Sequence, residues 1–273
     1  LLAKEYGSVI ILTKGSIEDC NTRYAQGGIA AAVGKGDSPE LHKHDTVDAG
    51  AGLCDVEAVD ILVQEAPSRI ADLTRMGVVF DTVHANVSLA REGAHSVARV
   101  LHAGGDSTGS HIELTLVGLA RSSRVEVREH CLAQEIIVEE GIATGVRVLN
   151  HRDNYTEEVH GKFIVLATGG AGKLFKYTTN SDVATGEGVA LAFEAGASVM
   201  DMEFFQFHPT ALHLRNVQPF LISEAVRGEG GILRNINGDP FMKEFHEWGD
   251  LAPRDVVSQA IVDQIKKYDS GHV

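Results

Sequence analysis

One segment, residues 223–231, places a hydroxyl, two carboxylates and a guanidinium beside several glycines. Its polar side chains include Ser223, Glu224 and Arg227. Glycines let a backbone approach a small ligand closely, and neighbouring charges can bind the polar groups of that ligand. We therefore interpret this segment as a ligand-contacting loop; a solvated charged turn is the alternative.

A second segment alternates polar and aromatic side chains just before Pro209. Because the residue before a proline avoids the helical conformation, His208 is expected in an extended chain. There, Gln206 and His208 project from one face, while Phe205 and Phe207 project from the other. We expect the two rings to anchor a strand that presents the polar pair to a cavity. A strand edge with solvated polar groups is the alternative.

A cation stands at the predicted start of a helix near the end of the chain. Pro253 marks the first turn, Arg254 follows it, and the apolar stripe runs through Val257, Ile261 and Ile265. A positive charge at a helix N-terminus is unfavourable by about 0.3–1 kcal/mol. This placement indicates a functional role for Arg254, and an ion pair with Asp255 or another surface carboxylate is the alternative.

Two glycine-rich segments, residues 25–29 and 167–172, have the character of loops that pass close to a phosphate or a flat ring. Each alone is equally consistent with a tight turn. The full dinucleotide fingerprint G-x-G-x-x-G is missing, so the first strand of any Rossmann unit is expected before Leu1.

Composition narrows the class of protein. The chain has 273 residues, and 44% of them are hydrophobic, which excludes wholesale disorder. Its formal net charge of -14 argues against a nucleic-acid binder. The three cysteines lack a C-x-x-C pair and the 13 histidines lack an H-E-x-x-H motif, so we predict no disulfide framework and no metal site. Without a long apolar run or a leader sequence, we expect a cytoplasmic protein that does not bind a membrane.

The elements that must position these residues follow from hydrophobic periodicity. We predict a strand over residues 8–14, helical structure over 40–76 with a break at Pro67, and a helix from about Asp106. Strands are expected over 125–127, 131–139 and 143–149, with a hairpin at Gly141, and a buried strand over 162–168. The predicted class is α/β: a parallel sheet covered by helices, with an inserted antiparallel section.

Five motifs in order give the chain a resemblance to a known family. They cover residues 24–28, 92–96, 207–210, 227–230 and 252–255, after a turn at Lys14. Together they resemble the succinate dehydrogenase and fumarate reductase flavoprotein family across nearly the whole chain. Residues 91–96, 99–103 and the pair Glu224-Ala225 are most similar to the L-aspartate oxidase branch of that family.

The resemblance implies a Rossmann-like FAD-binding domain with inserted antiparallel strands over residues 1–201 and part of an α+β capping domain over 202–273. It also implies a set of FAD contacts: Lys14, Asn21, Thr22, Ala25, Gln26, Gly27, Gly28, Ala167, Thr168, Gly169, Gly170 and Glu187. Many members have Asp where this chain has Glu187. Asn21 stands where membrane-bound relatives carry the histidine that binds flavin covalently, so FAD is expected to be non-covalent.

The implied reaction is oxidation of L-aspartate to iminoaspartate, with oxygen or fumarate as electron acceptor. This is the first step of de novo NAD biosynthesis, and it links the chain to quinolinate synthase. The resemblance assigns substrate binding to Glu92, Gln206, His208, Ser223, Glu224 and Arg254, and catalysis to Arg254, His208 and Glu224. Glu92 would face the substrate ammonium, and Arg254 would donate and accept a proton.

Two other functions remain open from the sequence. A fumarate reductase or succinate dehydrogenase flavoprotein subunit would use the same histidine, serine, glutamate and arginine positions. An inactive flavoprotein fragment is the second, because the first FAD strand of the family is expected before Leu1 and further substrate-binding residues after Val273.

Overall fold

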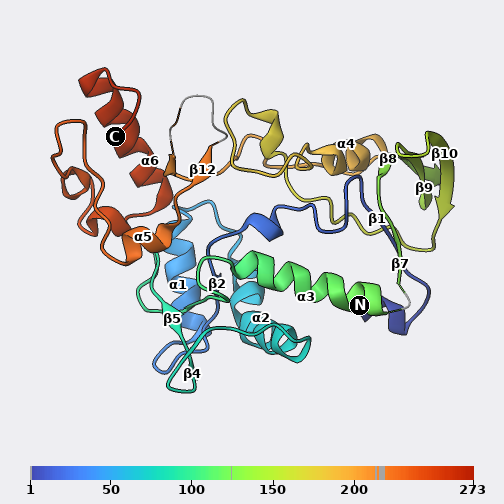
Figure 1. The fold of residues 1–273 in the computed structure, drawn as a ribbon, viewed down its shortest axis with the longest axis horizontal. Helices are drawn as coiled ribbons and strands as arrows, with labels where there is room; N and C mark the ends of the chain where they lie inside the picture. Colours follow the sequence, from blue (N-terminus) through green and yellow to red (C-terminus); the bar gives the residue numbers. More distant parts are fainter. Residues whose placement is uncertain (1, 124, 213, 215–218) are drawn as a thin grey trace. The chain divides into compact units, whose positions relative to one another are not determined.

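The computed structural model describes residues 2–123, 125–212, 214 and 219–273 (Figure 1). The chain forms two compact units, each built from two separate stretches of sequence. Unit 1 consists of Leu1–Tyr24 and Glu113–Phe205, and unit 2 of Ala25–Ile112 and Gln206–Val273. These units describe packing, and the functional division at residues 201 and 202 stays a prediction.

The largest sheet of unit 1 is antiparallel and has the strand order β10-β9-β8 (Figure 1). It contains β8 (Cys131–Glu139), β9 (Ile142–Asn150) and β10 (Tyr155–His160). Gly141 has a φ of +81°, which suits the tight turn between β8 and β9 and confirms the predicted hairpin. Cys131, Val146 and Val148 form a small buried cluster beneath the sheet.

A short parallel pair and several helices complete unit 1. β1 (Ile10–Leu12) pairs in parallel with β7 (Glu126–Arg128), as expected for an α/β chain. The helical elements are η1 (Leu2–Glu5), η2 (Thr22–Tyr24), η3 (Gly172–Leu174) and α4 (Glu187–Glu194), while α3 (Thr108–Ser122) begins in unit 2 and ends in unit 1.

The predicted strand over residues 162–168 is wrong. This segment is irregular, and Phe163 and Val165 are 80% and 84% exposed. A strand needs a neighbour that takes its backbone hydrogen bonds, and no strand within the described ranges pairs with this segment. An apolar sequence alone could not reveal that.

Two helices of unit 2 lie against each other, α1 (Pro39–Ala49) and α2 (Val56–Arg75) (Figure 1). The predicted break at Pro67 is wrong, because Pro67 lies inside α2 and the chain turns at residues 50–55 instead. Gly52 adopts a φ of +86° in that turn. Asp55 then caps α2 by accepting hydrogen bonds from the amides of Glu57 and Ala58, at 3.0 and 3.1 Å.

Unit 2 also contains short antiparallel strands. β2 (Ile29–Ala30), β6 (Val100–Leu101) and β5 (Leu89–Ala90) form one sheet in that order, and β3 (Thr82–Val83) pairs with β4 (Asn86–Val87). β11 (Ala211–Leu212) pairs with β12 (Phe220–Leu221). Val100 and Leu101 are buried, so β6 anchors the segment that precedes it.

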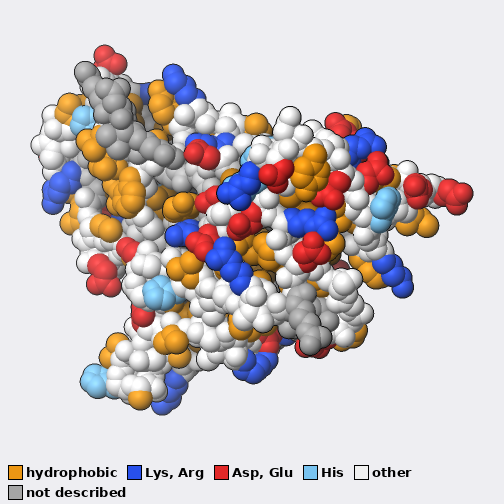
Figure 2. Space-filling model, turned by 45° about the vertical axis from the view of Figure 1, so that its right-hand side comes forward, with side chains coloured by type: hydrophobic (Ala, Val, Ile, Leu, Met, Phe, Trp, Pro, Cys, Tyr) orange, Lys and Arg blue, Asp and Glu red, His pale blue; other side chains and the backbone are white. Residues whose placement is uncertain are grey.

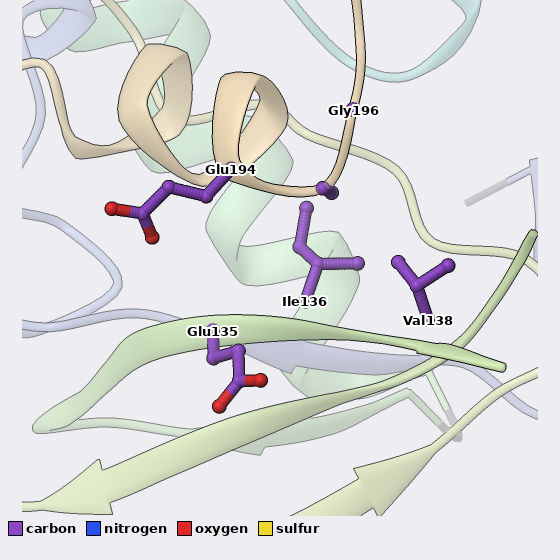
Figure 3. Close-up of a pocket in the computed structure, with 6 residues that line it drawn as sticks. Glu135, Ile136, Val138, Glu194 and Gly196 are labelled. Atoms are coloured by element: carbon purple, nitrogen blue, oxygen red, sulfur yellow. The ribbon is translucent and has the colours of Figure 1, made fainter.

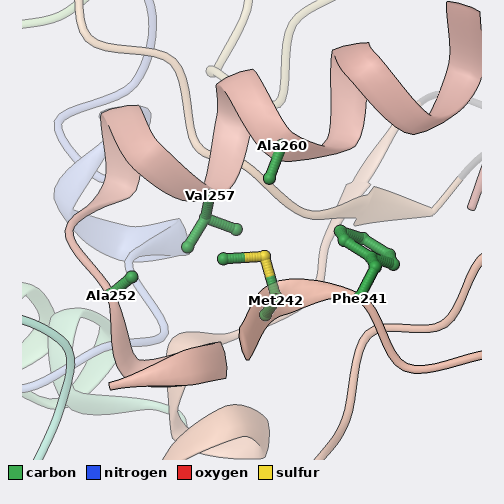
Figure 4. Packing of buried hydrophobic residues seen from close by; sticks show 5 residues of the cluster. All are labelled: Phe241, Met242, Ala252, Val257 and Ala260. Atoms are coloured by element: carbon green, nitrogen blue, oxygen red, sulfur yellow. The ribbon is translucent and has the colours of Figure 1, made fainter. Parts of the chain in front are cut away.

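The last helix of unit 2 is held by a compact apolar cluster. Val257 and Ala260 of α6 (Arg254–Tyr268) lie over Phe241, Met242 and Ala252 (Figure 4). Those three residues belong to or adjoin η4 (Met242–Glu244) and η5 (Gly249–Leu251). Burying a side chain such as Val257 or Met242 contributes about 1.5–3 kcal/mol. The cluster therefore fixes the first turn of α6, where Arg254 lies.

Acidic and basic side chains are interspersed on the face of the molecule shown in Figure 2, among many exposed apolar ones. Among the described residues, no helix has the length and apolarity needed to cross a membrane.

Candidate active site

The centre of the site in unit 2 is a buried carboxylate held by two guanidinium groups. Glu224 is 8% exposed. Arg254 Nε donates to Glu224 Oε1 at 2.9 Å and Arg254 Nη2 donates to Oε2 at 3.3 Å, while Arg227 Nη2 donates to Oε1 at 2.9 Å. Burial alone would raise the pKa of the Glu224 carboxyl, but the two guanidinium groups outweigh it and hold this pKa below its ordinary value. The three side chains together carry one positive charge.

Short elements with capped ends position these groups. Ser223 caps α5 (Glu224–Gly228) by accepting a hydrogen bond from the Ala225 amide at 3.2 Å, and its hydroxyl donates to Asp106 Oδ1 at 3.3 Å. Arg227 lies one helical turn after Glu224, and its Nη1 donates to the carbonyl of Asp250 at 2.7 Å. This bond ties α5 to η5, and η5 leads directly into α6.

The predicted polar pair, Gln206 and His208, lies in the same unit. Arg254 Nη1 donates to Gln206 Oε1 at 3.0 Å. The Nδ1 atom of His208 lies 2.9 Å from the carbonyl oxygen of Thr210. Burial, opposed by the Thr210 carbonyl and Glu224, lowers the pKa of His208, so the imidazole is neutral near pH 7.

The expectation of a strand over this segment is wrong, although the ring of Phe205 packs against that of Phe175 at a centroid distance of 4.4 Å. Residues 204–209 are irregular, and Phe205 and Phe207 are 42% and 53% exposed. Alternation of residue types can be read from sequence, but a strand also needs a neighbouring strand that takes its backbone hydrogen bonds. Arg254 orients Gln206 here instead.

Glu92 lies near this cluster and faces a histidine. Its Oε1 is 3.4 Å from Nε2 of His102, and the two side chains are 13% and 12% exposed. Burial raises the pKa of the Glu92 carboxyl, and the negative charges of Glu224 and Asp106 raise it further, whereas His102 and Arg254 oppose the shift. Sequence reasoning missed His102 and Asp106 as site residues, although His102 lies in one of the motifs that carry the family resemblance.

The loop that carries Glu92 is fixed by a buried ion-pair network. Asp45 Oδ2 accepts hydrogen bonds from the amide and hydroxyl of Ser96, at 2.9 and 2.8 Å, and from Arg99 Nη1 at 2.7 Å. Arg99 is fully buried, and its Nε and Nη2 donate to the two oxygens of Asp37 at 3.0 and 2.9 Å. Asp37 and Asp45 were also missed, because nothing in the local sequence signals that they meet Arg99.

Several residues predicted to contact FAD lie together in unit 1. Lys14 Nζ forms an ion pair with Glu187 Oε1 at 2.6 Å, and both side chains hydrogen bond to the hydroxyl of Thr185. Burial would raise the pKa of Glu187, but Lys14 and Thr185 hold it below its ordinary value. The amide of Asn21 donates to Asn180 Oδ1 at 3.0 Å, and its oxygen accepts from the Ser181 amide at 2.8 Å. Thr22 opens η2.

The predicted glycine turn of unit 1 leaves its backbone open. Residues 167–170 are exposed, Gly169 has a φ of +71°, and a Cβ added at Gly169 or Gly170 would meet nothing within 4 Å. A Cβ at Gly188 would lie 1.7 Å from Thr168 Oγ1, so the side chain of Thr168 packs against α4. An open glycine backbone beside polar side chains fits a flat, phosphate-bearing cofactor such as FAD.

The segment Ala25, Gln26, Gly27 and Gly28 lies in unit 2. The Ala25 carbonyl accepts a hydrogen bond from the Gly109 amide at 3.0 Å, at the start of α3. A Cβ on Gly27 would meet nothing within 4 Å, whereas a Cβ on Gly28 would lie 2.2 Å from the carbonyl oxygen of Leu101. Gly27 is therefore accessible to a ligand, while Gly28 is required for the close approach of β2 to β6.

A separate pocket of about 400 Å³ lies in unit 1 between β8 and the end of α4 (Figure 3). It is lined by Glu135, Ile136, Val138, Glu194, Ala195 and Gly196. None of the predicted site residues lines it, and its two carboxylates disfavour a phosphate. Within the described part of the chain, no group of three or more His, Cys, Asp or Glu side chains is arranged to hold a metal ion.

These features define a flavoprotein. The chain matches the FAD binding domain family over residues 1–273 and belongs to that family. This match confirms the predicted α/β FAD-binding fold class.

Among curated proteins, the chain is similar to L-aspartate oxidases. It is 45% identical to that of Streptomyces coelicolor, over 97% of this chain and 47% of the relative. It is 47% identical to that of Synechocystis, over 94% of this chain and 46% of the relative. The chain thus spans about half the length of the curated relatives it matches.

Solved structures of related flavoproteins share the fold. An E. coli quinol fumarate reductase variant matches with a TM-score of 0.91 and 30% identity, over 97% of this chain and 47% of that one. Sdh1 of Mycobacterium smegmatis matches with a TM-score of 0.78 and 35% identity, over 97% of this chain and 47% of that one.

Proposed function

We propose that this chain carries the substrate-oxidising part of an FAD-dependent L-aspartate oxidase. The reaction converts L-aspartate to iminoaspartate, with oxygen or fumarate as the electron acceptor. The observation that carries the proposal is the cluster of Glu224, Arg254, Arg227 and Gln206 beside the buried Glu92. Identities of 41–47% to L-aspartate oxidases from several organisms support it.

The cluster suits a dicarboxylate. Two guanidinium groups share one carboxylate, Glu224, which leaves a net positive charge available to a substrate carboxylate. The Arg254 side chain is 41% exposed, so its planar fork is accessible, and the amide of Gln206 lies beside it. The neutral imidazole of His208 supplies a further hydrogen-bonding group. Ser223 supports this region through its cap of α5.

When bound, FAD supplies the redox chemistry by accepting two electrons from the substrate. The residues that would hold it are the set predicted from the family: the Lys14 and Glu187 pair, Thr22, the exposed turn over 167–170, and residues 25–28. Asn21, which replaces the histidine of covalent relatives, supports a non-covalent cofactor, and its amide is already engaged by Asn180 and Ser181.

Arg254 would exchange a proton with the substrate. Its place in the first turn of α6 disfavours a positive charge, whereas the Glu224 carboxylate stabilises one. The two effects oppose each other on one side chain, so proton exchange by Arg254 would depend on both the α6 N-terminus and Glu224. His208 and Glu224 complete the proposed catalytic set.

The test is anaerobic reduction of the bound flavin by L-aspartate. We expect the yellow absorbance to bleach with L-aspartate, and hydrogen peroxide to form in proportion when air is admitted. Absence of amine oxidation in a protein that retains flavin would reject the proposal.

A fumarate reductase or succinate dehydrogenase flavoprotein subunit is the second candidate, favoured by the TM-score of 0.91 with quinol fumarate reductase. Bleaching by succinate, or fumarate reduction by a low-potential donor, without oxidation of L-aspartate would support it. A colourless protein without acid-releasable flavin would instead indicate an inactive fragment.

The proposed product places the chain at the start of de novo NAD biosynthesis. Iminoaspartate would pass to quinolinate synthase, which makes that enzyme a pathway partner, and the cytoplasm is the proposed compartment. Formation of quinolinate from L-aspartate only when both proteins are present would test this placement.

A further inference from the structure

In unit 1, a histidine side chain holds the backbone of Lys14, one of the residues predicted to contact FAD. The carbonyls on either side of Lys14 accept backbone hydrogen bonds of 2.9 and 3.0 Å from the amides of Cys131 and His130. The Lys14 carbonyl between them lies 2.6 Å from Nε2 of His151. Because a carbonyl can only accept, Nε2 carries the hydrogen and donates it.

The turn between β9 and β10 fixes the position of His151. Asn150 Oδ1 accepts hydrogen bonds from the amides two and three residues further along the chain, both at 3.0 Å. The His151 amide donates to the His130 carbonyl at 3.1 Å, and the two imidazole rings meet edge to face with centroids 5.6 Å apart. The imidazole is therefore held against the Lys14 carbonyl, although His151 is an exposed residue.

His130 joins the two segments through an uncommon backbone conformation. Its φ is +60°, a value that residues with side chains adopt rarely and that concentrates at functional sites. From this conformation, its amide donates to the turn at Lys14 and its carbonyl accepts from the amide of His151. The chain thus keeps a strained residue at the point where the His151 imidazole meets Lys14.

The position of the Lys14 backbone decides where its ammonium can lie. Lys14 Nζ pairs with Glu187 Oε1 at 2.6 Å, and both side chains hydrogen bond to the hydroxyl of Thr185. A lysine side chain is flexible, so its ammonium is placed accurately only where its backbone is fixed. His151 acts on the ion pair from the opposite end of the lysine.

We propose that His151 is a positioning residue of the FAD site: its Nε2–H holds the Lys14 carbonyl and thereby places the Lys14 ammonium against Glu187. This inference rests on the proposed function, which assigns Lys14 and Glu187 to FAD. The hydrogen on Nε2 is present in the neutral ring and in the protonated ring, because protonation adds a hydrogen at Nδ1. His151 is therefore a constant donor.

The first test needs no variant. In ¹⁵N NMR of the unaltered full chain near neutral pH, the His151 ring should carry a hydrogen on Nε2. A ring with its hydrogen on Nδ1 alone would overturn the proposal, because Nε2 could then donate nothing to the Lys14 carbonyl.

The second test measures the Glu187 carboxyl by ¹³C NMR without added flavin. Burial would raise the pKa of Glu187, but Lys14 and Thr185 hold it below its ordinary value. His151→Phe keeps a ring but removes the donor, so we expect this pKa to rise toward its ordinary value. His151→Gln places an amide N–H near the position of Nε2 and should restore the unaltered pKa. An unchanged pKa in His151→Phe, or the same rise in both variants, would overturn the proposal.

Flavin affinity supplies the third test, measured by titrating the flavin-free full chain with FAD and following flavin fluorescence. Loss of one hydrogen bond should raise the Kd for FAD about three- to tenfold in His151→Phe, with recovery to within about twofold in His151→Gln. His160→Phe is the control and should leave the Kd unchanged, because His160 is a histidine of β10 whose side chain is 60% exposed.

A double-variant comparison shows whether the effect passes through Lys14. In a Lys14→Met background, the lysine ammonium is absent, so adding His151→Phe should no longer weaken FAD binding. Equal weakening in the two backgrounds would reject a positioning role that acts through Lys14.

These outcomes separate the role of His151 from the proposed function. If the Glu187 pKa responds as expected but the unaltered chain binds no FAD, the FAD site and the proposed function fail, while the contact between His151 and Lys14 stands. If L-aspartate bleaches the bound flavin but the variants change neither the Glu187 pKa nor the FAD affinity, the oxidase function stands and the role of His151 is rejected.

Discussion

Replacing Arg99 by methionine should destabilise unit 2 strongly. The guanidinium is fully buried and donates three hydrogen bonds of 2.7–3.0 Å to Asp37 and Asp45. Methionine retains much of the apolar volume but leaves two carboxylates, whose side chains are 3% and 7% exposed, without a cation. Removing one partner of a buried ion pair costs about 3–5 kcal/mol. We therefore expect Arg99→Met to lower the free energy of unfolding by an amount in that range at pH 7.

The loss should depend on pH in a defined direction. Burial would raise the pKa of Asp45, but hydrogen bonds from Ser96 and the Arg99 charge outweigh it and lower this pKa below its ordinary value of about 4. In the unaltered protein, the ionised Asp45 carboxylate contributes to the free energy of unfolding when the pH is above its ordinary pKa. This contribution is lost as the pH falls below that pKa. In Arg99→Met the pKa of Asp45 should rise, because burial remains, so the variant gains stability on protonation. The difference in the free energy of unfolding between the unaltered protein and Arg99→Met should therefore become smaller from pH 7 toward pH 4.

The assay is urea unfolding followed by the fluorescence of Trp248, the single tryptophan of the chain, which lies in unit 2. Arg69→Met is the matched control, since Arg69 also pairs with carboxylates but its side chain is 59% exposed. We expect the control to lose no more than about 1 kcal/mol. A loss below about 1 kcal/mol in Arg99→Met, or a loss that does not change with pH, would refute the reasoning.

Three further predictions concern the cofactor and substrate residues. Gly28→Ala should destabilise unit 2 by about 1–3 kcal/mol, because the added Cβ would lie 2.2 Å from a backbone oxygen. Gly27→Ala should change stability little, because a Cβ there would meet nothing within 4 Å. Equal midpoints of thermal unfolding for the two variants would contradict this prediction. Arg254→Lys should lower turnover of L-aspartate about ten- to hundredfold with flavin content unchanged, since lysine cannot bind Glu224 as a fork, and near-full turnover with bound FAD would reject the role of Arg254. Glu187→Gln removes the ion-pair partner of Lys14, and the two side chains are 24% and 41% exposed, so we expect the free energy of unfolding to change by less than about 1 kcal/mol. The variant should retain less flavin, measured as the ratio of flavin absorbance to protein absorbance. Full flavin retention would argue against a cofactor role for Glu187.

Local chemistry made part of the fold predictable. The hairpin at Gly141 and the start of α6 near Arg254 follow from a turn glycine and a proline, whose effects extend over only a few residues. The break between the two helices was predicted at Pro67, because a proline is a strong local signal, but the chain turns at residues 50–55. A helix can contain a proline when the rest of the helix and its capping residues stabilise it.

The strand predicted over 162–168 failed for a different reason. Its residues are apolar, but strand formation and burial are both properties of a pair of segments. Periodicity describes one segment at a time and cannot supply the partner. The same limit applies to the strand predicted around Phe205 and Phe207, because no strand within the described ranges pairs with that segment.

The sequence by itself determined which chemical groups this protein has available: a carboxylate and guanidinium segment around Glu224, a cation at the start of α6, and glycine turns suited to a cofactor. Only the tertiary structure decided their pairing. It directs Arg227 and Arg254 to one carboxylate, buries Arg99 between Asp37 and Asp45, and sets Glu92 opposite His102. The physical reason is that charge states depend on burial and on neighbours brought together across the chain, and neither quantity is encoded in local spacing.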